Sequence, residues 1–520
     1  MLSYLNSELL NKTFSSVLYS YLFLYSSINI SFANEILPAK YNNTESLSEQ
    51  IKPLENNRLK KTRNQKEIDD TSSRQIKLKD LDNIIKENSN ELNIMEFRIA
   101  EARHLLRSEI SLWYPTLNLS SAGLPQYMKG NTYNELSTST SNDQIKSSIE
   151  AKLKWDLINP SRIPRIVAAR AEFDKARLSY DIKYQDLLLE AKIQFLELKK
   201  SLQDIHIAKE SFNTSKELFK QARYKLNTGL ASKLDFLEAK TQLLNDKQLL
   251  VEKRGLKRIN QIRLKKLLNL NSNETPIIES SSMLIGLWKL TLEESIPIAY
   301  KYNEDLKNLI LEKSIVNNRA KISLSEARPT ISIFNTFDGY FSKGESYVAK
   351  PRKNNSINSS NNTFGIEFDW LVYNGGYAKS KYNANMANLR EVDARIALTK
   401  TQIRGDIEQY YFRLDIARNN IMHSYRAKKA AKEALRLALL RLESGITNQR
   451  EVLNNQRDLT QSEAAYVKAL NDYNLFLIRL QRETGISELM TCKSLDKGSK
   501  NISQSLDICK ILKEDYILLN

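Results

Sequence analysis

The side chains that most often do chemistry are few in this sequence and lie far apart. Its three histidines, His104, His206 and His423, each stand alone in a stretch predicted to be helical, and its two cysteines are Cys492 and Cys509. No histidine or cysteine pair has the spacing of metal ligands. Neither a Walker loop nor a Gly-x-Ser-x-Gly motif occurs. We therefore predict that the protein is not an enzyme and holds no metal or cofactor.

Two other motifs also carry no catalytic prediction. In an exported protein Cys492 and Cys509 would be able to close a disulfide around the C-terminal tail, and free thiols remain open as the alternative. The run Asn374-Gly375-Gly376 follows directly on a strand pattern. It therefore indicates a turn from strand to helix and not a phosphate cradle.

The clearest local signal is the alternation of apolar and polar residues in two windows, 149–157 and 364–372. This alternation is typical of a strand with one apolar face. An amphipathic sheet in water and membrane-crossing strands that face lipid are the two interpretations. Polar segments at 124–144 and 342–362 are predicted to be surface loops within the two hairpins. The candidate lipid-facing residues are Ile149, Leu153, Trp155, Leu157, Phe364, Ile366, Phe368 and Trp370.

The first 33 residues are predicted to be a signal peptide, with Lys12 ahead of an apolar stretch and Ala33 before the expected cut. A polar lead-in is expected over 34–76. No later window has some 18 consecutive apolar residues, as a membrane helix needs. An exported chain of this kind would cross a membrane with strands.

The sequence also contains itself twice. Residues 78–119 align with 292–333 at a constant offset of 214, and Gly229 meets Gly445 at an offset of 216. We predict a first repeat over 77–269, a linker over 270–290 and a second repeat over 291–485, followed by a tail over 486–520. Each repeat is expected to run helix, strand, loop, strand, long helix, turn and helix.

Very long helices are predicted because only 14 glycines and 10 prolines punctuate 520 residues. A first helix is expected over 77–112 and a long one over 163–227, where the two shorter helices of the repeat stack beside the longer one. The fold class is mainly α with transmembrane β. Four strands per chain cannot close a membrane barrel, so we expect either two copies with eight strands or three with twelve.

The residues on which this architecture rests resemble the outer membrane factor family, the TolC-like channels of efflux and type I secretion. The resemblance spans about 78–485. It is carried by Ala327-Arg-Pro-Thr-Ile-Ser332, Asp369-Trp-Leu-Val-Tyr-Asn-Gly-Gly376, Arg441-Leu-Glu-Ser-Gly445, Glu451-Val-Leu453, Asp472-Tyr473 and Thr484-Gly485.

The resemblance implies a homotrimer with a shared 12-stranded barrel in outer membrane lipid and a helical barrel in the periplasm. It also implies a passive exit duct that is opened by a periplasmic adaptor and driven by an inner-membrane pump of the ABC, RND or a similar class. Two turns would dock the adaptor, formed by Leu226, Asn227, Thr228, Gly229, Leu230 and Ser232 and by Leu442, Glu443, Ser444, Gly445 and Ile446.

The family's pore constriction falls on Glu451 and Asn454, and the second of these positions is neutral here. A ring of Glu451 carboxylates would attract cations. The alternative is that Glu451 caps the helix after the turn.

Two other classes of protein remain as alternatives. An exported periplasmic coiled-coil protein without a channel would explain the helices but not two matching amphipathic strands. The net charge of +17 would suit a nucleic-acid-binding coiled coil. Because the charge is spread along the helices of an exported chain, we expect a solvated surface and no nucleic acid. Substrate class, pump and adaptor are not predicted.

Overall fold

The computed structural model describes residues 72–132, 140–278, 284–346, 353–486 and 489. Every element described below belongs to the unit Thr71–Asn520. The predicted signal peptide, most of the predicted lead-in, and Cys492 and Cys509 lie outside the described residues.

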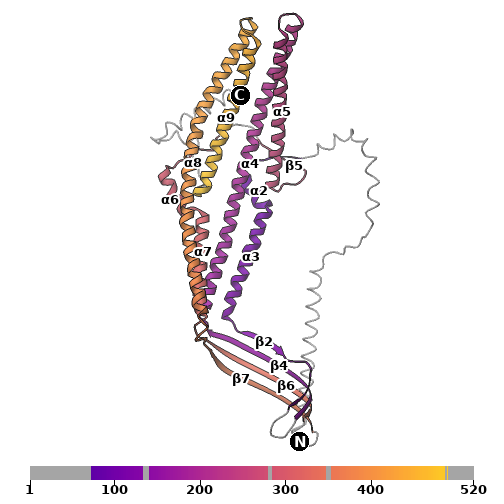
Figure 1. Cartoon of the computed structure of the whole chain (residues 1–520), viewed down its shortest axis with the longest axis vertical. Coiled ribbons are helices and arrows are strands. Elements are labelled where there is room, and N and C mark those ends of the chain that lie inside the picture. The colour runs from indigo at the N-terminus through magenta and orange to yellow at the C-terminus, as the bar shows by residue number, and fades with distance from the viewer. Residues whose placement is uncertain (1–71, 133–139, 279–283, 347–352, 487–488, 490–520) are drawn as a thin grey trace, which may run out of the picture. The chain divides into compact units, whose positions relative to one another are not determined.

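Four long helices run as two antiparallel hairpins (Figure 1). The first pairs α4 (Arg162–Asn227) with α5 (Lys233–Leu267), and the second pairs α8 (Tyr377–Glu443) with α9 (Gln449–Thr484). The helix predicted over 163–227 is confirmed to within one residue. Leu, Ala, Lys, Glu and Arg dominate these spans, and all of them favour helix. Of the helices that the structure describes, none is both long and apolar enough to cross a membrane.

The single helix predicted over 77–112 is wrong, because the chain breaks at Ser89. It forms α2 (Leu81–Asn88) and α3 (Asn90–Ile110). The same break at Asn303 separates α6 (Leu292–Tyr302) from α7 (Glu304–Ser325). Ser89 and Asn303 leave the helical conformation, with ψ of 112° and 124°.

Each side chain at a break caps the helix that follows it. The Ser89 hydroxyl accepts from the Leu92 amide at 3.4 Å, and the Asn303 side chain accepts from the Leu306 amide at 3.0 Å. A side-chain oxygen that satisfies the first free amides of a helix stabilises a new start there. The two breaks are 214 residues apart, which is the offset found in the sequence.

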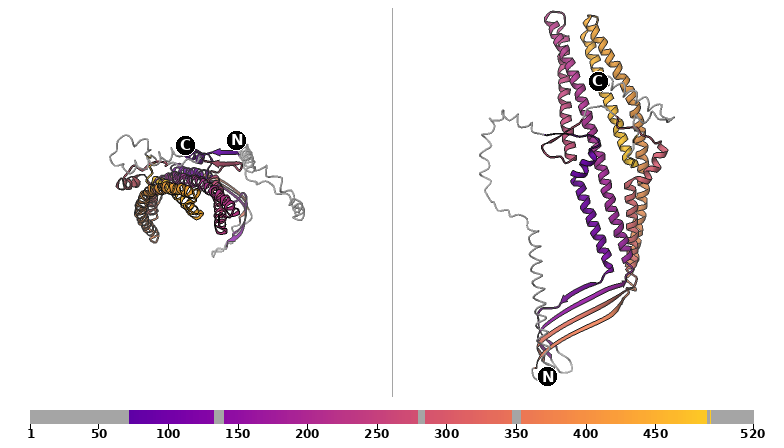
Figure 2. Two further views of the ribbon diagram at one scale, coloured as in Figure 1. Left: turned by 90° about the horizontal axis from the view of Figure 1, so that it is seen from above. Right: turned by 180° about the vertical axis from the view of Figure 1, so that it is seen from behind.

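The helices form one curved layer in which each helix packs on its neighbours (Figure 2). α2, α3 and α5 lie along α4, while α7 and α9 lie between α4 and α8. The expected stacking of shorter helices beside the longer one is confirmed. The layer therefore has two edges, with α3 and α5 at one and α8 at the other.

Segments before and between the helices add a short sheet. β1 (Ser72–Gln75) pairs in parallel with β5 (Glu274–Ile277). Ile76 and Ile278, just after these strands, are buried in one apolar cluster with α2, α4 and α5. Part of the predicted linker and the end of the predicted lead-in thus belong to the folded body.

A larger antiparallel sheet is built from β2 (Thr116–Ser121), β3 (Gln126–Thr132), β4 (Thr140–Ile158), β6 (Thr330–Ser346) and β7 (Lys353–Asp369). β2 and β3 pair in turn with β4, which pairs with β6, which pairs with β7. Four strand positions result, and the first of them is interrupted. Within the described residues β2, β3 and β7 pair on one side only.

The loops predicted over 124–144 and 342–362 are therefore wrong for much of their length. Strands continue through 126–132, 140–144, 342–346 and 353–362. These segments are rich in Asn, Ser and Thr, a composition that indicates a loop when no partner strand is known. Backbone pairing between β6 and β7, from Ser346 opposite Lys353 onward, makes them strands.

The predicted apolar residues share one face of this sheet. Trp155 lies opposite Ile333, which lies opposite Ile366, and directly paired residues point to the same side. Six of these predicted residues have exposed fractions from 40% to 71%: Leu153, Trp155, Leu157, Phe364, Ile366 and Phe368. Trp370, just past β7, is 51% exposed and Ile149 is half-buried. The opposite face carries charges, among them the ion pair of Lys154 with Glu367 at 2.8 Å.

Replacing Gly344 in β6 with alanine is expected to weaken this sheet. The added Cβ would lie 2.2 Å from the carbonyl oxygen of Asp143 in β4, a backbone atom that cannot move away without disturbing the pairing. Overpacking of this kind costs about 1–3 kcal/mol. The temperature at which the strand signal in circular dichroism is lost should fall. Gly339→Ala is the control, because its Cβ would be 3.8 Å from the Ile149 oxygen. Equal transitions for the two variants would contradict the argument.

Candidate functional site

The two helical hairpins end in turns of the same geometry. Gly229 and Gly445 adopt left-handed φ angles of 76° and 71°, as predicted for helix-ending glycines. The Leu230 amide donates to the Lys225 carbonyl at 2.7 Å, and the Ile446 amide donates to the Arg441 carbonyl at 2.9 Å. With the glycine amides bonded to the carbonyls of Leu226 and Leu442, each turn is a Schellman motif.

Side chains then start the returning helices. Ser232 and Asp235 form a reciprocal capping box at the start of α5. At the start of α9 the Asn448 side chain accepts from the Glu451 amide at 3.1 Å. Both turns are therefore fixed at each end by local hydrogen bonds.

Most of the residues predicted to dock an adaptor lie on the surface of these turns. Leu230 and Ile446 are 77% and 69% exposed, which is unusual for large apolar side chains. Leu226 is half-buried. Leu442 is only 8% exposed and packs in a cluster with Val452. The exposed members are Asn227, Thr228, Gly229, Leu230, Ser232, Glu443, Ser444, Gly445 and Ile446.

Glu451 is held within its own hairpin. Arg441 pairs with its Oε1 at 2.9 Å, and the Thr447 hydroxyl donates to its Oε2. The helix cap is the Asn448 side chain, which accepts from the Glu451 amide, and the Glu451 carboxylate itself bonds Arg441 and Thr447. Asn454, one turn further along, is exposed. A role of Glu451 and Asn454 in a pore depends on other copies of the chain and stays a prediction.

Polar contacts tie the two hairpins together next to the turns. The Gln449 side chain in α9 donates to the Leu218 carbonyl in α4 at 2.8 Å, and Arg450 pairs with Glu238 of α5. Further along, the Gln242 side chain donates from its Nε2 to the buried carboxylate of Asp246 at 3.0 Å. Its Oε1 accepts from Arg457 of α9 at 3.3 Å. These contacts therefore link the two hairpins near their turns.

A second polar centre lies where α9 ends, and sequence reasoning missed it. The Arg482 side chain is 11% exposed and contacts Asp186 of α4 at 2.8 Å and Asp305 of α7 at 3.4 Å. Glu304 lies 4.0 Å from it. Because Arg482 reaches across 296 residues to Asp186, only a known fold could reveal the contact.

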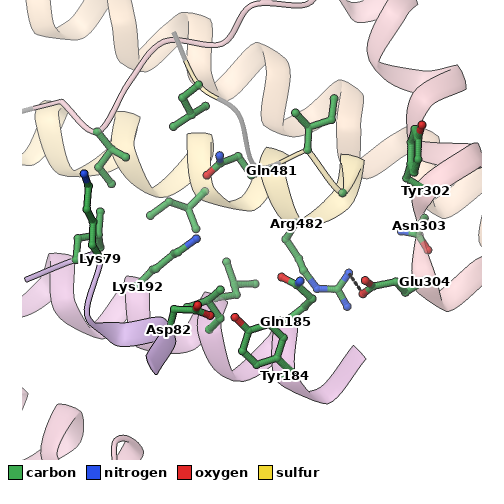
Figure 3. Close-up of a pocket in the computed structure, with 18 residues that line it drawn as sticks. Lys79, Asp82, Tyr184, Gln185, Lys192, Tyr302, Asn303, Glu304, Gln481 and Arg482 are labelled. Carbon is green, nitrogen blue, oxygen red and sulfur yellow. Dashed lines mark ion pairs between the residues drawn. The ribbon is translucent and has the colours of Figure 1, made fainter. Parts of the chain in front are cut away.

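Beside Arg482 is a pocket of about 530 Å³ between the two halves of the chain (Figure 3). Leu78, Leu188, Ile285 and Ile478 supply apolar walls. Burial lowers the pKa of Lys192 there, although the carboxylate of Asp82 acts in the opposite direction. Ile486 and Leu489, which are among the last described residues, also line the pocket.

Glu483 adjoins this centre and is poised to change its charge near neutral pH. Burial raises its pKa to about 7, and the carboxylate of Asp406 adds to the rise. Asp305 and Asp186 act in the same direction and Arg482 opposes them. Ionised Glu483 is therefore unfavourable in the packed joint between α7, α8 and α9.

The remaining candidates for chemistry are dispersed. His104, His206 and His423 are exposed. In the part of the chain that the structure describes, no group of His, Cys, Asp and Glu side chains is placed to hold a metal ion.

Comparison with protein families gives a match over most of the helical and strand regions. The model of the outer membrane efflux protein family matches residues 81–270 and 319–485. No curated protein sequence matches the chain.

Solved structures with the same fold are outer membrane proteins. CusC superposes with a TM-score of 0.68 and 14% identity, covering 78% of this chain and 91% of CusC. VceC from Vibrio cholerae gives 0.65 and 14%, with 78% and 96% covered. The CmeC outer membrane channel of Campylobacter jejuni gives 0.64 and 13%, with 84% and 89% covered. Identities this low support the fold alone.

Stability should fall as the pH rises through 7, and Glu483 should account for part of the fall. Folding raises the pKa of the Glu483 carboxyl group from 4.5 to about 7. Such a group adds to the free energy of unfolding below pH 4.5, and this contribution is lost as the pH rises through the folded-state pKa. With solvent screening the loss is roughly 2 kcal/mol. Thermal unfolding from pH 5 to 8 should therefore show a smaller decrease for Glu483→Gln than for the original chain.

The matched control for this measurement is Glu293→Gln. Glu293 is an exposed carboxylate in α6. Its replacement should leave the pH dependence unchanged. An identical slope for Glu483→Gln and the original chain would exclude Glu483 as the source.

Proposed function

The chain belongs to the outer membrane efflux protein family, and from this premise we propose that it is the exit channel of a tripartite efflux or type I secretion system. Members of this family are efflux proteins of the outer membrane. The single observation that carries the proposal is the four-position antiparallel sheet, which has one exposed apolar face, one charged face and two open edges.

Such a sheet fits a membrane only if its edges are paired. In lipid an unpaired backbone amide or carbonyl costs several kcal/mol, so a sheet edge cannot face hydrocarbon. Neighbouring strands are antiparallel throughout, and β2 therefore runs opposite to β7. The β7 edge of one copy is complementary to the β2 edge of the next, and the alternation continues without interruption across copies.

The number of copies follows from the interior that a channel needs. Two copies give eight strands, and a barrel of about eight strands is filled by its own side chains. Three copies give twelve strands and leave an open interior, so the proposal is a homotrimer. Phe364, Ile366 and Phe368 face lipid in this arrangement, while Lys154 and Glu367 on the opposite face line the water-filled channel.

The helical layer continues the channel into the periplasm as a helical barrel. Substrate passes through it without chemistry, since the proposed role is passive and needs no cofactor. The exposed turns around Gly229 and Gly445 are the proposed docking surface for a periplasmic adaptor. An inner-membrane pump of the ABC, RND or a similar class supplies the energy. A periplasmic coiled-coil protein without a channel is disfavoured by the family membership and by the one-sided apolar sheet.

The experiment that tests this function combines oligomer mass with conductance. Protein purified in detergent should have the mass of a trimer by native mass spectrometry. In a planar lipid bilayer it should give small discrete current steps, because a narrow shared channel admits ions. A monomer or dimer without conductance would reject the channel and leave the coiled-coil alternative.

Glu451→Gln should weaken the block of single-channel current by divalent cations if the constriction lies at this position. Carboxylates gathered in a ring attract cations, and removal of the charge removes the attraction. Glu443→Gln is the matched control, because Glu443 is an exposed carboxylate in the same turn. Equal block in both variants and in the original chain would leave Glu451 only its contacts with Arg441 and Thr447 within the hairpin.

A further inference from the structure

The two outermost long-helix surfaces of the layer carry exposed apolar residues that nothing in the described chain covers. On α5 these are Leu237, Leu244, Val251 and Ile262, with exposed fractions of 46%, 54%, 62% and 59%. The first three repeat every seven residues, and Ile262 falls on the neighbouring position of the same heptad stripe. This surface is called the α5 stripe.

The opposite edge of the layer has a matching surface on α8. Phe412, Ile416, Leu437 and Leu440 are 58%, 58%, 47% and 47% exposed. Phe412 and Leu440 are four heptads apart, while Ile416 and Leu437 are three heptads apart. This surface is called the α8 stripe. Its repeat is that of a helix face in contact with another helix.

Each stripe also contains a glycine that packing within the chain does not explain. Gly255 in α5 and Gly405 in α8 are inside long helices, where glycine costs roughly 1 kcal/mol relative to alanine. A Cβ added at either position would meet nothing within 4 Å. Small residues at these places leave room for side chains that approach from outside the protomer.

Basic residues lie beside the α5 stripe near Ile262, and the α8 stripe has both carboxylates and arginines beside it near Ile416. Arg254, Lys257, Arg258 and Arg263 of α5 have no carboxylate partner among the residues that the structure describes. Glu408 and Asp415 of α8 lie beside Phe412 and Ile416, and their ion pairs are with Arg404 and Arg418 of the same helix. A surface that covers the α5 stripe needs carboxylates near Ile262, and the α8 stripe carries them near Ile416.

If α5 and α8 run antiparallel, the separation of apolar residues along one stripe matches the separation along the other. α5 starts after the Gly229 turn and α8 ends before the Gly445 turn, so both are measured from the same end. Leu237 and Ile262 are 25 positions apart, and Leu440 and Ile416 are 24 positions apart. At about 1.5 Å per residue the two separations differ by less than the width of a side chain.

We propose that α8 of one copy packs antiparallel on α5 of the next, with Leu440 against Leu237 and Ile416 against Ile262. The proposal rests on the self-association in the proposed function and adds its interface and register. In the sheet the β7 edge follows the same side of the chain as α8, and β2 follows the same side as α3 and α5. The same pair of edges therefore meets in the helices and in the sheet.

Disulfide crosslinking between engineered cysteines tests the register. In the full chain with Cys492→Ser and Cys509→Ser, the pair Ile262→Cys and Ile416→Cys should link neighbouring copies into covalent dimers and trimers under mild oxidation. The control pair, Leu237→Cys and Ile416→Cys, uses the same stripes out of register. It should give roughly tenfold less product, because disulfides form only where Cα atoms come within about 7 Å. Two further variants, Ile262→Cys alone and Ile416→Cys alone, show whether either substitution by itself disturbs assembly.

The outcomes separate the register from the function. A trimer with normal conductance that shows no covalent oligomers for the Ile262 pair, or equal linkage for the control pair, would overturn the register and leave the channel in place. Covalent adducts to a different protein would mean that an adaptor covers the stripe, and would also overturn it. A monomer without conductance in the original chain would remove the proposed function together with the interface.

Discussion

Unpaired backbone at the two edges of the sheet is the constraint on which the rest of the structure depends. Every interior strand position has a partner on both sides, while β2, β3 and β7 present amides and carbonyls on one side within the described residues. A bilayer does not tolerate such edges. The apolar face around Trp155 and Ile366 favours lipid, and in the proposed channel neighbouring copies pair the open edges. Under that proposal, membrane insertion and assembly of the copies are a single step for this chain.

The helical layer meets a similar requirement by a different route. Its helices satisfy their own backbone groups, so the groups that remain to be covered at its edges are the exposed apolar side chains of the α5 and α8 stripes. Contacts within the layer run from neighbour to neighbour. One apolar cluster lies in the first half of the chain, a second lies in the second half, and a third joins the two halves near the turns. Polar contacts such as Arg482 with Asp186, and Gln449 with the Leu218 carbonyl, also join the two halves.

The sequence predicted the long helices and the turns well because their causes are local. Helix-forming residues fill α4 and α8, and the glycine just after each of them, Gly229 or Gly445, takes the left-handed conformation. Ser89 and Asn303 were missed because one polar residue within a helical pattern is common, and only the backbone reveals its capping role. The polar halves of β6 and β7 were missed for another reason. Their composition indicates loop, and the pairing with neighbouring strands overrides it. Arg482 and its carboxylates come from three distant segments, so spacing in the sequence carried no signal for them.

The breaks at Ser89 and Asn303 have a mechanical consequence. α4 and α8 run 66 and 67 residues through one unbroken ladder of backbone hydrogen bonds, from the sheet to the turns. The pairs α2–α3 and α6–α7 beside them have no such ladder, because they are interrupted at Ser89 and at Asn303. A load applied at the turns therefore reaches the sheet through two stiff rods in each chain. The interrupted helices act as compliant spacers that let the rods tilt without stretching the layer.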